Sequence, residues 1–184
     1  MASRENRMRT QVTGLLRNLD AIAVENPVGP GTPDVNCVLG WIELKSIDRP
    51  KKEGTPVDGN LEHFTQQQRN FLKRRWRSGG GAWLLVKMGR DWLIFDGLTA
   101  ADKVGKGPDV AELCELALEV WPKAPTSEEL TECLKKTSPP EKGSASFGGD
   151  AAGSRRTWPR SSESTSTRTT DGRKIFLQKR PPPM

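Results

Sequence analysis

The chain has 184 residues, of which 34% are hydrophobic and 28% are charged, and its formal net charge is +6. It contains no run of about 18 apolar residues and no apolar segment near its start, so the sequence predicts neither a membrane span nor a secretory leader. Its three cysteines are widely spaced and fit neither a disulfide framework nor a zinc site. This cysteine usage favours a reducing cytoplasm.

The positive charge is concentrated at the C-terminal end of the sequence. Residues 1–137 carry 20 Lys and Arg against 19 Asp and Glu, whereas residues 138–184 carry 9 against 4. The second segment is rich in Ser, Thr, Gly, Pro and Arg and has too few apolar residues to bury a core. We therefore predict a folded domain over residues 1–122, a short helical extension over 123–137 and a disordered basic tail over 138–184.

The first predicted element is a helix over about residues 3–19, followed by a strand over 21–24. Ser3 is a suitable N-cap, and extension of the apolar stripe back by one turn reaches Glu5. An inward Glu5 would bring a carboxylate to the interior, whereas the alternative is a solvated first-turn glutamate favoured by the helix dipole. The stripe itself, at spacings of three and four, consists of Met8, Val12, Leu15, Leu16 and Leu19.

Residues 33–45 predict a β-hairpin that carries three charges, Asp34, Glu43 and Lys45. Alternate residues of a strand share a face, so Glu43 and Lys45 point to the same side. A two-residue turn at Gly40-Trp41 or at Leu39-Gly40 places Asp34 on that side too, and a turn of odd length would separate them. The other face is expected to be apolar, with Val35, Cys37, Leu39, Ile42 and Leu44.

The helix predicted to start after Thr65 has an apolar side and a basic side. Gln68 lies three residues after Thr65, as in a capping box, and it also falls on the apolar stripe. We expect the basic side to bind nucleic-acid phosphates without reading sequence, together with Lys51 and Lys52 of the preceding loop. The apolar stripe is Phe64, Phe71, Leu72 and Trp76, and the basic side is Arg69, Lys73, Arg74 and Arg77.

The remaining segments complete an α/β pattern. They are a loop over 47–62, a helix stop at the glycines 79–81, a hairpin of strands over 82–87 and 92–95, a loop over 97–108, and helices over 110–120 and about 127–136.

Two acids and a lysine on one strand face suit phosphodiester hydrolysis assisted by a divalent cation. Mg²⁺ prefers oxygen ligands and is usually held by one or two carboxylates and several waters. Asp34 and Glu43 would supply the carboxylates, the Leu44 carbonyl is a further candidate ligand, and Lys45 would orient a water or offset phosphate charge. The residue pattern alone equally allows a cross-strand ion pair on a solvated sheet face.

Three motifs resemble the PD-(D/E)XK nuclease superfamily: Gly31-Thr32-Pro33-Asp34, Trp41-Ile42-Glu43-Leu44-Lys45 and Thr65-Gln66-Gln67-Gln68-Arg69. The resemblance covers about residues 3–96 and is nearest to virus-type replication–repair nucleases and Holliday-junction-resolvase-like proteins, many of them phage-encoded. It implies a restriction-endonuclease-like core with a mixed four- to five-stranded sheet flanked by helices. It also implies Asp34 and Glu43 as metal ligands, Lys45 as the catalytic lysine, Gln68 as a supporting residue, and Glu5, or alternatively Glu25, as an additional acid.

The expected function is therefore a Mg²⁺-dependent DNA endonuclease or junction-resolving enzyme of DNA repair, recombination or replication, with Mn²⁺ as a substitute. Its location would be the cytoplasm, or the host cytoplasm for a phage protein. The expected partners are duplex or branched DNA and a second copy of the chain, because junction resolvers cut two strands symmetrically. The basic tail would contact nucleic acid or a protein.

Two alternatives to the nuclease remain. One is a non-catalytic nucleic-acid-binding module of the same fold. The other is a structural or partner-binding protein, in which Lys179-Arg180-Pro181-Pro182-Pro183 is a polyproline ligand.

Overall fold

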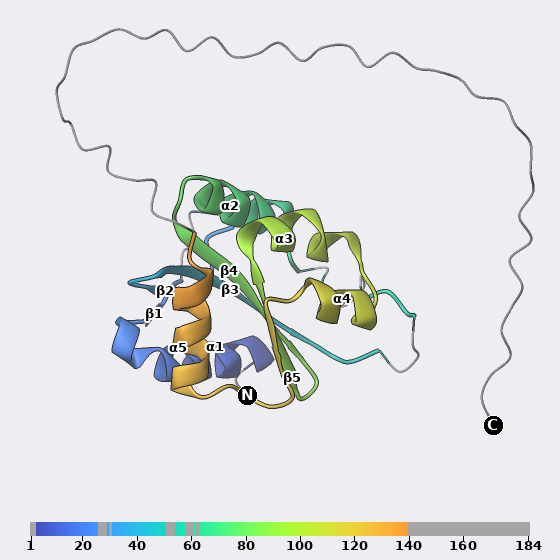
Figure 1. The fold of residues 1–184 in the computed structure, drawn as a ribbon, viewed down its shortest axis with the longest axis horizontal. Helices are drawn as coiled ribbons and strands as arrows, with labels where there is room; N and C mark the ends of the chain where they lie inside the picture. Colours follow the sequence, from blue (N-terminus) through green and yellow to red (C-terminus); the bar gives the residue numbers. More distant parts are fainter. Residues whose placement is uncertain are drawn as a thin grey trace, which may run out of the picture. The chain divides into compact units, whose positions relative to one another are not determined.

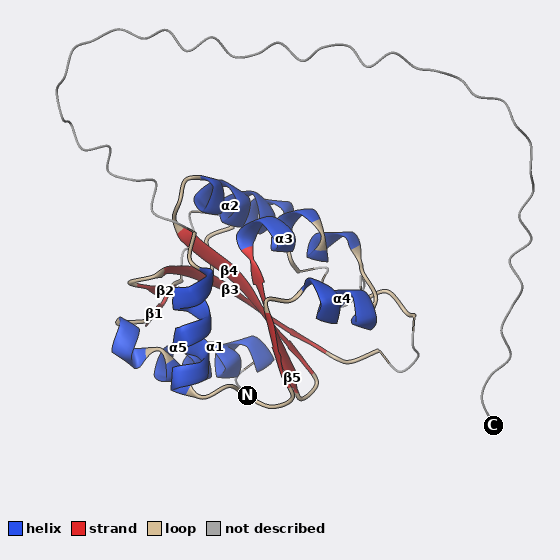
Figure 2. Cartoon of the chain, in the orientation of Figure 1, coloured by secondary structure: helices blue, strands red, loops and turns tan. Residues whose placement is uncertain are grey.

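The computed structural model describes residues 3–25, 29, 31–50, 54–57, 61 and 63–139. These residues form one six-stranded mixed sheet with helices on both faces (Figures 1 and 2). The strands lie side by side in sequence order, and every neighbouring pair is antiparallel except β3 and β4, which are parallel. The strands are β1 (Ile22–Ala23), β2 (Val35–Cys37), β3 (Gly40–Ile47), β4 (Gly81–Met88), β5 (Asp91–Asp96) and β6 (Glu119–Trp121).

The helices divide into two layers. Helices α1 (Arg4–Leu15) and α5 (Ser127–Thr137) share one apolar cluster with one face of the sheet. Helices α2 (Gln66–Arg77), α3 (Gly97–Asp102) and α4 (Val110–Leu116) share a second cluster on the opposite face (Figure 1). Short 3-10 helices η1 (Arg17–Leu19) and η3 (Val104–Lys106) follow α1 and α3. Within the described ranges, no helix combines the length and apolar character needed to cross a membrane.

The first helix begins where the residue pattern predicts but ends earlier, at Leu15, and the 3-10 helix η1 replaces its last predicted turn. The Ser3 hydroxyl accepts a hydrogen bond from the Asn6 backbone N–H at 3.1 Å and so caps the helix. The predicted apolar stripe is confirmed, because its members pack into the same cluster as Ile42 and Leu44 of β3. Those members are Met8, Val12, Leu16 and Leu19, which are buried, and Leu15, which is half-buried.

The β2–β3 hairpin has the predicted faces but a different turn. Cys37 pairs with Gly40 and Val35 with Ile42, so the turn is Val38-Leu39, and both predicted positions are wrong. The turn still has two residues, which preserves the alternation of faces. Gly40 instead begins β3 with a φ of +148°, and a Cβ there would lie 2.2 Å from the Gly81 carbonyl oxygen. The glycine is therefore required by the close approach of β3 and β4.

The segments after β5 differ from the sequence prediction. The loop expected over 97–108 contains α3 and η3, because the Asp96 carboxylate caps α3 and Ala100 and Val104 are buried. The helix expected over 110–120 ends at Leu116, and the chain continues as β6, in which Trp121 pairs with Trp92 of β5. Pairing with an edge strand thus overrides helical periodicity, and the sheet has six strands instead of four to five.

Candidate active site

An ion pair lies buried in the centre of β3. The Lys45 Nζ atom is 2.8 Å from the Glu43 Oε1 atom, and the exposed fractions of the two residues are 5% and 0%. Both side chains project from one face of β3, and Ile42 and Leu44 project from the other face, as the alternation of faces predicts. Among the described residues, these two are the only charged residues in the buried class. Removing two charges from water is costly, so the pair requires strong local compensation.

Gln68 contributes part of that compensation from the first turn of α2. Its side-chain oxygen accepts a hydrogen bond from the Thr65 backbone N–H at 2.9 Å, which completes the predicted capping box. Its side-chain nitrogen donates to the Glu43 Oε1 atom at 2.5 Å. One amide therefore holds the helix start and the buried carboxylate together.

Asp34 lies directly before β2, next to the same part of β3. Its Oδ2 atom accepts a hydrogen bond from the Leu44 backbone N–H at 2.9 Å. The N–H and C=O of one strand residue point to the same side, so the Leu44 carbonyl points to the same side of β3 as this N–H. Gly31 assists this placement because its backbone, at a φ of +85°, lies so close to Gln67 of α2 that a Cβ would be 2.6 Å away. The segment before Asp34 is thus held against the helix turn that carries Gln68.

Arg9 of α1 makes a contact with Asp34 that the sequence analysis missed. Its Nη2 atom lies 2.7 Å from the Asp34 Oδ1 atom, and its Nη1 atom lies 3.4 Å from Glu25. The Arg9 and Asp34 side chains are less than one-fifth exposed, whereas that of Glu25 is 85% exposed. The signal in the sequence is the spacing from Glu5, because residues four apart share one side of a helix.

Glu5 is half-buried in the first turn of α1 and lies within electrostatic range of Glu43. Burial raises the pKa of Glu43 to about 7, against the lowering effect of Lys45. The negative charges of Asp34 and Glu5 raise that pKa further. The structure thus brings Asp34, Glu43, Lys45 and Gln68 together, with Glu5 within electrostatic range. Among the described residues, Glu25 is linked to this group by its ion pair with Arg9.

The acceptor atoms of this group fit a hard divalent cation. The Glu43 Oε2 atom is buried and has no hydrogen-bond partner within the part of the chain that the structure describes. Such an acceptor is costly unless a donor or cation satisfies it. Within these same ranges no group of three or more His, Cys, Asp and Glu residues could hold a metal ion. The candidate donors are Glu43, Asp34 and the Leu44 carbonyl, a set that would leave most coordination positions of a Mg²⁺ ion to water.

The predicted phosphate-binding residues of α2 have mixed surroundings. Lys73 pairs with Asp102 of α3 at 2.5 Å, and the Arg74 guanidinium lies over the Phe71 ring. Lys73, Arg74 and Arg77 nevertheless line a shallow hollow of about 400 Å³. Arg69 packs over the Phe64 ring and donates to the Phe64 carbonyl, whereas Lys51 and Lys52 lie outside the described residues.

Comparisons with known proteins do not assign this chain to a family. A scan against protein-family models finds no match, and a search of the curated proteins also finds none.

Proposed function

We propose that this protein is a metal-dependent nuclease that hydrolyses DNA phosphodiester bonds and that its sheet is a restriction-endonuclease-like core of the PD-(D/E)XK type. The observation that carries the proposal is the state of the Glu43 carboxylate. One oxygen is held by Lys45 and Gln68. The other is buried with no hydrogen-bond partner among the described residues, and the Asp34 charge acts on the same carboxylate. An apolar pair would stabilise the sheet at least as well, so a buried group of this kind indicates a functional site.

The residues divide the chemical work as follows. Glu43, Asp34 and the Leu44 carbonyl would hold Mg²⁺, or Mn²⁺ in its place. A bound divalent cation acts as a Lewis acid and lowers the pKa of a coordinated water. Lys45 would orient the attacking water and offset negative charge that develops on the phosphate. Gln68 keeps the Glu43 carboxylate in one orientation, and Glu5 adds negative charge at the edge of the site.

The substrate side of the proposal rests on the hollow beside α2. Arg74 and Arg77 are exposed there and would contact phosphates, which gives affinity without base recognition. We propose DNA repair, recombination or replication in the cytoplasm as the setting, with a second copy of the chain as partner if branched DNA is cut.

The Arg9–Asp34 contact favours one alternative, a nucleic-acid-binding module that keeps the fold without catalysis. A guanidinium already neutralises one of the two candidate metal-ligand carboxylates. In a non-catalytic relative of a nuclease, such an internal cation would take over the structural role of a metal ion.

One experiment separates the enzyme from the binding module. The full chain is incubated with duplex, single-stranded and four-way-junction DNA in Mg²⁺ and in chelator, next to the Asp34→Ala and Lys45→Ala variants. Cleavage that requires the metal and is lost in both variants supports the nuclease. Equal DNA binding by all three proteins without any cleavage would reject the nuclease and leave the binding module.

A further inference from the structure

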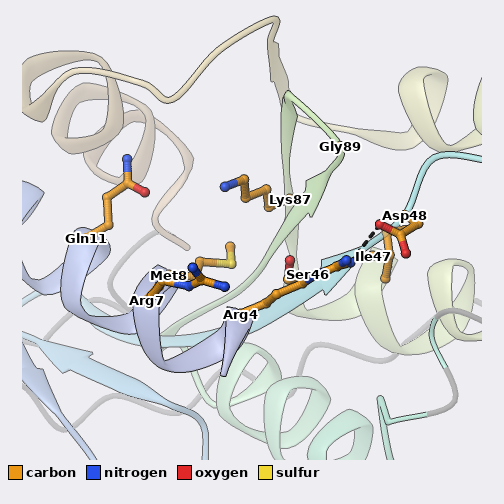
Figure 3. Close-up of a pocket in the computed structure, with 9 residues that line it drawn as sticks. All are labelled: Arg4, Arg7, Met8, Gln11, Ser46, Ile47, Asp48, Lys87 and Gly89. Carbon is orange, nitrogen blue, oxygen red and sulfur yellow. Dashed lines mark hydrogen bonds and ion pairs between the residues drawn. The ribbon is translucent and has the colours of Figure 1, made fainter. Parts of the chain in front are cut away.

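Two adjoining hollows form a second surface, which we call the α1–β4 groove. This surface lies on the flank of α1 opposite to Glu5 and Arg9. The larger hollow, of about 460 Å³, is lined by Arg4, Arg7 and Gln11 of α1 and by Lys87 of β4. Figure 3 shows Lys87 extending from β4 toward the side where Arg7 and Gln11 lie. The smaller hollow, of about 230 Å³, shares Gln11 and Lys87 and adds Arg90, Lys123 and Trp92.

The α1–β4 groove is strongly basic, although residues 1–137 as a whole are nearly neutral. Five cationic side chains line it, and its one carboxylate, Asp48, is paired with Arg4 at 2.7 Å (Figure 3). Arg7, Arg90 and Lys123 are exposed and form no ion pair with any residue that the structure describes. Residues 1–137 as a whole carry 20 positive and 19 negative side chains, so this local excess does not follow from composition.

Helix geometry relates the groove to the candidate active site. Arg4, Arg7 and Gln11 are spaced by three and four residues and occupy one flank of α1. Glu5 and Arg9, also four apart, occupy the other flank, and buried Met8 lies between the two sets. On the sheet side, Ser46 of the groove directly follows Lys45 of the site. Consecutive strand residues point to opposite faces, so the groove lies on the α1 face of the sheet, whereas Glu43 and Lys45 lie on the α2 face.

We propose that the α1–β4 groove binds the sugar–phosphate backbone of a nucleic acid. The cations are spread along two open hollows. Arg7, Arg90 and Lys123, which form no ion pair with any described residue, are exposed. This arrangement suits a row of phosphates better than a single small anion, which would need converging donors in one pocket. The proposal rests on nucleic acid as the substrate of the proposed function, but it does not require cleavage.

The test measures DNA affinity in chelator, so that catalysis plays no part. Fluorescence anisotropy of a labelled DNA duplex is recorded over a range of salt concentrations for the full chain and for the triple variant Arg7→Gln, Arg90→Gln, Lys123→Gln. The matched control is the triple variant Arg17→Gln, Lys135→Gln, Lys136→Gln, which removes the same charge from exposed positions outside the groove. Both variants keep residues 138–184, so any DNA binding by that segment is common to them, and thermal unfolding checks that both are folded.

The groove variant is expected to bind the duplex at least about tenfold more weakly at low salt. Its salt slope should be smaller by about two to three, one for each lost phosphate contact, while the control changes much less. Equal weakening in both variants, or no weakening, would overturn the proposal. Loss of binding to phosphatidylserine vesicles or to polyglutamate with DNA affinity retained would also overturn it and indicate another class of partner. DNA binding that depends on the groove without Mg²⁺-dependent cleavage would reject only the nuclease.

Discussion

The Arg9 Nη2 atom lies 2.7 Å from the Asp34 Oδ1 atom, so a cation of α1 already occupies one carboxylate of the proposed metal site. Its Nη1 atom lies 3.4 Å from Glu25, which is exposed and gives the guanidinium a second carboxylate nearby. If Asp34 ligates Mg²⁺, the metal competes with Arg9 for the same oxygen. The apparent metal affinity then reports on this contact.

We predict that Arg9→Gln lowers the half-saturating concentration of divalent cation by about tenfold. Removal of a positive charge a few ångströms from the site strengthens the attraction for a cation by one to a few kcal/mol, even after solvent screening. Calorimetric titration with Mn²⁺ measures the change directly. Arg17→Gln, on the exposed surface just after α1, serves as the control, and equal affinities in the two variants would show that Arg9 does not compete with the metal.

The raised pKa of Glu43 predicts how stability depends on pH without metal. The folded-state pKa is about 7 and the ordinary value is 4.5, so the folded protein holds this proton more tightly. The Glu43 contribution to the free energy of unfolding is therefore favourable below pH 4.5 and is lost as pH rises to 7. That loss is roughly 3 kcal/mol, because one pKa unit corresponds to about 1.4 kcal/mol. Glu43→Gln should remove this pH-dependent loss of stability.

Urea unfolding of wild type and Glu43→Gln at pH 5 and pH 8, in chelator, tests this prediction. The variant should be the more stable protein at pH 8, and the two should be close at pH 5. The same pH dependence in both proteins would mean that Glu43 does not titrate near neutrality.

The two roles of Gln68 are separable. Gln68→Glu keeps a capping side chain at the third helical position but replaces the donor to Glu43 with a carboxylate. We expect a loss of roughly 1–3 kcal/mol at pH 8 that becomes smaller at pH 5, where the carboxyl groups protonate. Thr65→Ala removes only the cap and should cost about 1 kcal/mol at both pH values. A pH-independent loss in Gln68→Glu would contradict the contact with Glu43.

The Gly40–Gly81 approach predicts opposite outcomes for two glycine substitutions. Gly40→Ala places a Cβ 2.2 Å from the Gly81 carbonyl oxygen at a positive φ, so we expect a loss of more than about 2 kcal/mol or failure to fold. Gly14→Ala lies inside α1, and no described residue outside the helix backbone comes within 4 Å of the new Cβ, so it should instead stabilise by about 0.5–1 kcal/mol. Thermal unfolding measures both. A Gly40→Ala protein as stable as wild type would show that β3 and β4 are not held this closely.

The alternation of faces in the hairpin was predictable because a two-residue turn preserves it wherever the turn lies. The position of the turn was not, since the neighbour that requires Gly40 is β4, more than 40 residues away along the chain. The capping box of α2 could be predicted from the sequence, because Thr65 and Gln68 are only three residues apart. Local patterns thus predicted the individual elements, and long-range pairing decided their register.

The same distinction applies to the site and to the end of the domain. Asp34, Glu43 and Lys45 could be grouped from strand geometry, but the contact from Arg9 depends on how α1 packs across the sheet. Likewise, β6 exists because Leu118 to Trp121 reach the open edge of β5, where the Leu118 N–H donates to the Ile94 carbonyl at 2.8 Å. Sequence periodicity within 110–120 contains no information about that edge.

We propose that the Glu43 carboxylate belongs to a metal-dependent hydrolytic site. Cleavage of labelled DNA at pH 8 in Mg²⁺ by wild type and by Glu43→Gln tests it most directly, because the variant is expected to be folded and the more stable of the two. Wild type is expected to cleave only with the metal, and Glu43→Gln is expected to lose at least about a hundredfold in rate. Cleavage by wild type in chelator, or a Glu43→Gln rate equal to that of wild type, would contradict it.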